Sequence, residues 1–99
     1  MSNSLQLSIL RGFIEKELDT ALSDKNLSTY RFIFDGTKPL IKNTDDTIFG
    51  YIYGYIFGKV DFMYSSFNRN PSKEEVNEIL KAIENRNMEI KSQINKTKT

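Results

Sequence analysis

The sequence predicts a mainly α-helical fold in which three long helices carry a small β-hairpin. Apolar residues recur every three or four positions near both ends of the chain, which is typical of helices. A short segment with alternating character precedes an Asp-Gly pair, which indicates a hairpin. Ninety-nine residues with 38% hydrophobic content correspond to a single domain spanning 1–99.

The first helix is expected at about residues 4–24. Arg11, Glu15 and Lys16 occupy its polar side, and Asp24 with the two residues after it is expected to end it. The apolar stripe on the opposite side predicts one buried face; its members are Ile9, Leu10, Phe13, Ile14, Leu18, Ala21 and Leu22.

Residues 29–42 are expected to form the hairpin, with strands at about 29–34 and 38–42. Tyr30, Phe32 and Phe34 recur at period two, and such residues are common in strands. Asp35-Gly36 is a favoured two-residue turn, and Pro39 restricts the returning strand to an edge. This hairpin must pack on the helices, because an isolated hairpin is only marginally stable.

The segment IFGYIYGYIFGKV, residues 48–60, supports two interpretations. A helix over about 47–68, begun by Asp45, Asp46 and Thr47, gathers its small residues into one narrow stripe, namely Gly50, Gly54, Gly58, Asp61 and Ser65. Strands over 48–67 are the alternative and would give an α+β fold. The helix is favoured, because a strand is usually about 5–6 residues long. The uncharged run at 48–58 is too short to span a membrane, which takes about 20 residues.

The last helix is expected at about residues 72–93, because Ser72 and Glu75 form a capping box. Its apolar positions follow a heptad spacing in which Asn87 occupies a position that can specify a partner helix. The alternative is that this is simply the third core helix. The residues of the seam are Val76, Leu80, Ile83, Asn87, Ile90 and Ile94. Residues 95–99 are expected to be a frayed, lysine-rich tail.

Composition argues against an enzyme. The chain has no cysteine and no histidine, so the usual nucleophile, general base and metal ligands are missing, and we expect no cofactor and no metal. The N-terminus lacks the basic and apolar regions of a signal peptide. We therefore expect a cytoplasmic protein without a membrane span.

The sequence predicts a small, non-catalytic interaction or regulatory protein that self-associates as a homodimer. The glycine stripe permits close packing, either against another helix of the same chain or against a second copy. The expected interface residues, drawn from the glycine-rich and C-terminal helices, are Gly50, Gly54, Gly58, Asp61, Ser65, Ile83, Asn87 and Ile90. A first alternative is a nucleic-acid-binding accessory protein that uses Arg31, Lys38, Lys42, Lys96 and Lys98. A second is a small-ligand or metal-binding protein centred on Asp61 and the tyrosines.

Overall fold

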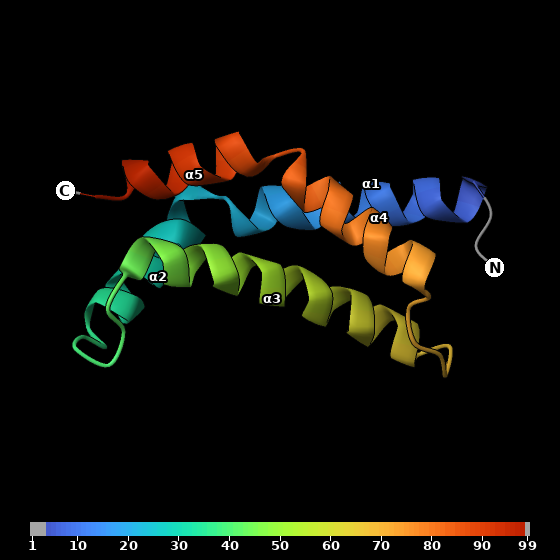
Figure 1. Ribbon diagram of the computed structural model, residues 1–99, viewed down its shortest axis with the longest axis horizontal. Helices are drawn as coiled ribbons and strands as arrows, with labels where there is room; N and C mark the ends of the chain where they lie inside the picture. The colour runs from blue at the N-terminus through green and yellow to red at the C-terminus, as the bar shows by residue number, and fades with distance from the viewer. Residues whose placement is uncertain (1–3, 99) are drawn as a thin grey trace.

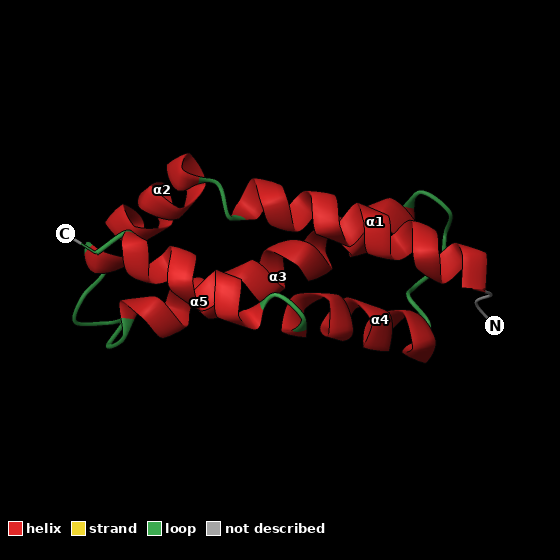
Figure 2. Cartoon of the chain, turned by 90° about the horizontal axis from the view of Figure 1, so that it is seen from above, coloured by secondary structure: helices red, strands yellow, loops and turns green. Residues whose placement is uncertain are grey.

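A computed structural model describes residues 4–98 and shows an elongated bundle of five helices (Figure 1). The bundle measures 45 × 24 × 20 Å, and α3 runs along it with α1, α2 and α5 packed against it. The predicted fold of three helices and a hairpin is wrong, because residues 4–98 contain no strand (Figure 2). The helices are α1 (Ser4–Ala21), α2 (Asp24–Asp35), α3 (Thr44–Ser65), α4 (Lys73–Glu84) and α5 (Asn87–Lys96).

Helix α2 replaces the first strand of the predicted hairpin. Ser23 caps α2 by accepting a hydrogen bond from the Asn26 backbone N–H at 3.2 Å. Asp24, which was expected to end the first helix, is therefore the first residue of a second helix. Leu27, Tyr30 and Phe34 follow helical spacing and face the core. Gly36 has φ −71° and continues the helical turn, whereas the predicted hairpin turn requires positive φ.

The Ser23 cap gives a direct test of this helix. We expect Ser23→Ala to lower the free energy of unfolding by about 1 kcal/mol, because the first turn of α2 loses a capping acceptor. Ser28→Ala, an exposed position within α2, should change it by less than about 0.5 kcal/mol. Urea unfolding followed by circular dichroism measures both, and equal effects would contradict a capping role for Ser23.

Helix α3 is observed where a helix was favoured, and the alternative with strands over 48–67 is wrong. It begins earlier than expected, because Asn43 is the capping residue and accepts from the Asp46 backbone N–H at 3.0 Å. Every fourth residue is buried, which places one continuous row of side chains in the core; the row is Ile48, Ile52, Ile56, Val60 and Tyr64.

The predicted helix over 72–93 is divided into α4 and α5. The capping box of Ser72 and Glu75 is confirmed. The break lies at Arg86, whose backbone leaves the helical region and whose guanidinium reaches α1, donating to the Glu15 carboxylate at 3.2 Å and pairing with Asp19 at 2.9 Å. The bend lets α4 pack on α1 while α5 packs on α3.

Helix α5 extends through Lys96 into the predicted tail, whose last residue, Thr99, lies outside the described residues. Within 4–98, no helix combines the length and apolar character that crossing a membrane requires.

Candidate interaction surface

The glycine stripe of α3 lies on the outside of the bundle, opposite the buried row. Gly50, Gly54 and Gly58 are exposed, and a Cβ atom added to any of them would have no neighbour within 4 Å apart from the local backbone of α3. Asp61 and Ser65 are exposed on the same stripe. The stripe therefore packs against no other described helix of this chain, and Gly12 on α1 is equally open.

Aromatic side chains border a shallow hollow of about 550 Å³ above Gly54 and Gly58. Tyr51 forms one border and is held by the ring of Tyr30 on α2, with 4.6 Å between ring centroids. Phe62 lines the same hollow and is 80% exposed. This surface, which we call the α3 glycine face, consists of Gly50, Tyr51, Gly54, Tyr55, Gly58, Lys59, Asp61, Phe62 and Ser65.

Two polar groups of the α3 glycine face, those of Tyr55 and Lys59, contact neighbouring side chains. Tyr55 donates a hydrogen bond to the Glu17 carboxylate at 3.1 Å, and burial together with this bond raises the pKa of Tyr55 to about 12. The Lys59 ammonium lies 5.4 Å from the centre of the Tyr55 ring. Tyr55 is thus neutral near pH 7 and presents a fixed ring.

Asp61, the centre of the predicted ligand or metal site, faces solvent. Among residues 4–98, no group of three or more Asp or Glu residues is arranged to hold a metal ion. Of the tyrosines that were expected to accompany Asp61, Tyr51 contacts the ring of Tyr30 on α2, Tyr55 donates to Glu17 on α1, and Tyr53 packs on Phe49 of α3.

The three predicted interface residues of the C-terminal segment lie elsewhere. Ile83 and Ile90 are fully buried in the core of the single chain. Asn87 begins α5, and its Oδ1 is buried without a hydrogen-bond partner in the described part of the chain. Ile83 and Ile90 therefore offer no surface to a second chain, whereas Asn87 is partly exposed.

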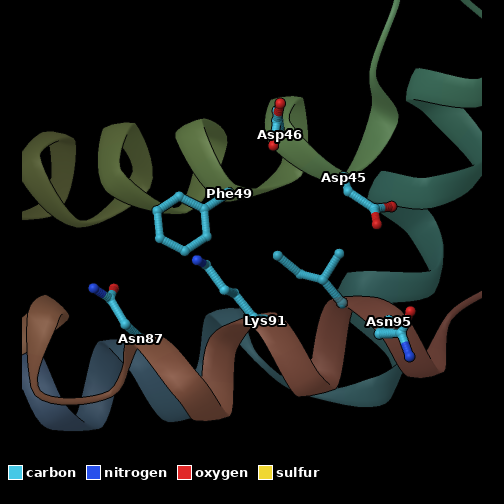
Figure 3. Close-up of a pocket in the computed structure, with 7 residues that line it drawn as sticks. Asp45, Asp46, Phe49, Asn87, Lys91 and Asn95 are labelled. Atoms are coloured by element: carbon cyan, nitrogen blue, oxygen red, sulfur yellow. The ribbon is translucent and has the colours of Figure 1, made fainter.

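Asn87 borders a second hollow, of about 670 Å³, between α5 and the first turns of α3 (Figure 3). Lys91 projects towards Phe49, with its ammonium 6.0 Å from the ring centre. Asp45 turns away from Lys91 towards α2. The hollow thus combines one cation, two carboxylates, amide groups and an aromatic ring.

The structure brings together several of the residues predicted to bind nucleic acid, although the hairpin that was to carry Arg31 and Lys38 is absent from residues 4–98. Arg31, Lys38 and Lys98 line one hollow of about 800 Å³. Their charges are largely offset, because Arg31 and Lys98 pair with Asp45, and Lys38 lies 3.7 Å from Asp35. Burial opposes ionisation of Asp45, but hydrogen bonds from Lys98 and Arg31 outweigh it and lower its pKa. Lys42 and Lys96 are exposed.

The sequence analysis did not predict a buried polar cluster that lies at the C-terminal end of α3. Glu75 is 1% exposed and accepts hydrogen bonds from Tyr64 Oη at 2.6 Å, from Arg69 at 2.8 and 3.1 Å, and from the Ser72 backbone at 2.8 Å. Arg69 also stacks on the Tyr64 ring, 4.5 Å from its centre. The capping box was the visible signal, but Tyr64 and Arg69 are brought to it only by the turn after α3.

Comparison with known proteins finds no family model that matches the chain, and no significantly similar curated protein or solved structure.

Proposed function

We propose that this protein is a non-catalytic interaction module that self-associates through the α3 glycine face. The observation that carries the proposal is the exposure of this face: three glycines at every fourth position lie uncovered beside exposed aromatic rings. Large exposed aromatic groups gathered on one surface mark sites where proteins meet. Small residues at this spacing allow two helix backbones to approach closely.

A second copy of the chain is the partner that we propose for this face. In a twofold-symmetric pair the same patch lies on both partners, so one surface must supply both the hollow and the group that fills it. The hollow above Gly54 and Gly58 and the exposed ring of Phe62 belong to one patch and meet that requirement. Charges are also present in both signs, as Lys59 and Asp61.

The test is the solution mass at increasing protein concentration, measured by light scattering. We expect the wild-type protein to approach twice the chain mass of 11.5 kDa. Gly54→Leu should raise the dimer dissociation constant about tenfold or more, because overpacking at a close contact costs roughly 1–3 kcal/mol. The single chain has room for the added side chain, so the variant should stay folded.

Gly12→Leu is the matched control, because Gly12 is an exposed helical glycine with equally open surroundings on α1. It should leave the dissociation constant unchanged, while both variants gain helix stability of up to about 1 kcal/mol in the single chain. Two results would contradict the proposal: a wild-type protein that remains monomeric, or equal masses for the folded Gly54→Leu variant and the wild type.

A further inference from the structure

Three large apolar side chains are exposed together at one end of the bundle. Phe32 and Ile33, on the outer side of α2, are 81% and 51% exposed, and Leu40, in the following loop, is 88% exposed. The loop begins with turns that continue from the end of α2: the Thr37 hydroxyl donates to the Ile33 carbonyl at 2.8 Å, and the Leu40 N–H donates to the Thr37 carbonyl at 3.0 Å. The loop that holds Leu40 therefore lies at the same end of the bundle as α2 (Figure 1).

The C-terminus brings lysines to this end of the molecule. Helix α5 finishes at the same end of the bundle as the loop that joins α2 to α3, as both ribbon views show (Figures 1 and 2). Phe32, Lys38 and Lys98 line the same hollow, so apolar and basic groups are adjacent here. Lys42 and Lys96 are exposed and do not line the hollow, but each follows or precedes a lining residue, Lys38 or Thr97, in the sequence.

The charges at this end do not cancel. Residues 31–46 and 94–98 carry five basic and three acidic side chains. Lys38 and Lys98 have carboxylate partners, whereas Lys42 and Lys96 form no ion pair within residues 4–98. Among the described residues Asp46 also forms no ion pair, and this end keeps a net charge of +2 in which Lys42 and Lys96 are the unpaired cations.

We infer that the end formed by Phe32, Ile33, Leu40, Lys42 and Lys96 docks on the surface of an anionic lipid bilayer. Apolar side chains enter the boundary between headgroups and acyl chains, while lysines lie near the anionic headgroups. A nucleic acid could also bind these lysines, but the exposed Ile33 and Leu40 would contribute little to that binding, because aliphatic side chains cannot stack on bases as aromatic rings do. The combination of aliphatic and basic groups favours lipid. This inference does not depend on self-association through the α3 glycine face.

Cosedimentation of the full chain with vesicles tests the inference. We expect binding to vesicles of phosphatidylcholine and phosphatidylserine in a ratio of about seven to three, and much weaker binding to phosphatidylcholine alone. Lys42→Gln with Lys96→Gln should lower the partition coefficient about thirtyfold, at about 1 kcal/mol per lysine near an anionic leaflet. Phe32→Ser with Leu40→Ser should lower it about tenfold or more.

Matched controls are available on other surfaces. Phe67 and Met88 are 69% and 84% exposed away from this end, and Lys16 and Lys81 are exposed on α1 and α4. Phe67→Ser with Met88→Ser, and Lys16→Gln with Lys81→Gln, should leave the partition coefficient within about twofold. Circular dichroism verifies that each variant is folded.

Two outcomes would overturn the inference: the absence of binding to the mixed vesicles, and an equal loss of binding in the control variants. In the first case, binding to a single-stranded oligonucleotide that survives Phe32→Ser with Leu40→Ser would identify the alternative. That result would assign the lysines to a nucleic-acid surface.

Discussion

Replacing Glu75 by glutamine should lower the free energy of unfolding at pH 7 by about 3 kcal/mol. The carboxylate is buried, and burial alone would oppose its ionised form. The hydrogen bonds from Arg69, the Ser72 backbone and Tyr64 outweigh burial and lower the pKa of Glu75 to about 2, from an ordinary value of 4.5. A shift of this size corresponds to about 3 kcal/mol of stabilisation.

The same shift predicts how the effect depends on pH. A carboxyl group whose pKa is lowered by folding stabilises the protein fully above its unfolded pKa, and this stabilisation is lost as the pH falls towards the folded pKa. For Glu75 the loss should occur between about pH 4.5 and pH 2. The difference between wild type and Glu75→Gln should therefore shrink from about 3 kcal/mol at pH 7 to nearly zero at pH 2.

Urea unfolding at a series of pH values, followed by circular dichroism, measures this difference. Using the difference between variants removes the contribution of the other carboxylates, which titrate in both proteins. Glu74→Gln is the control, because Glu74 is the exposed neighbour of Glu75 in the first turn of α4. It should cost less than about 1 kcal/mol. A constant difference between pH 7 and pH 2 would contradict the role given to the Glu75 carboxylate.

The helices that local signals could predict are those with strong caps and clear spacing. The capping box at Ser72 and Glu75 is visible in the sequence, because both partners lie within one turn. The division between α4 and α5 is not visible, because Arg86 is held by Glu15 and Asp19 on α1, about seventy residues away in the chain. Long-range ion pairs leave no trace in local periodicity.

The hairpin was predicted because period two and period 3.6 overlap in a short apolar segment. Tyr30 and Phe34 satisfy both periods, and the consecutive Phe32 and Ile33 disguise the helical one, since these two residues point outwards from α2. The exposed apolar residues that confuse the pattern are the ones we assign to a binding surface. Local rules are expected to fail where a sequence serves a function as well as the fold.

The sequence predicts which residues share the glycine stripe of α3, but not whether that stripe faces the core or solvent. The helical wheel places Gly50, Gly54 and Gly58 on one stripe, and the structure agrees. Whether that stripe meets another helix of the same chain depends on tertiary packing. The sequence is compatible with a covered stripe and with an exposed one. The structure leaves the stripe exposed because α1, α2 and α5 all pack on the other sides of α3.

Replacing Ile56 by alanine should show which side of α3 supports the single chain. Ile56 is fully buried at the centre of the row that packs against the rest of the bundle. Truncation removes its buried apolar surface and leaves a cavity, so we expect a loss of about 2–5 kcal/mol in the free energy of unfolding. Such a loss is a large fraction of the total stability of a small domain, and thermal unfolding should begin at a markedly lower temperature.

The control for Ile56→Ala is an alanine substitution with the opposite expected sign. Gly12 is exposed on α1 with no neighbour within 4 Å of an added Cβ, so Gly12→Ala should raise the free energy of unfolding by up to about 1 kcal/mol. Urea unfolding measures the free energy of unfolding of both variants. It is done at one low protein concentration, at which dimerisation contributes little to the stability. A loss below about 1 kcal/mol for Ile56→Ala would mean that this side of α3 is not the buried one. The exposed glycine stripe, and with it the proposed interface, would then lose its structural basis.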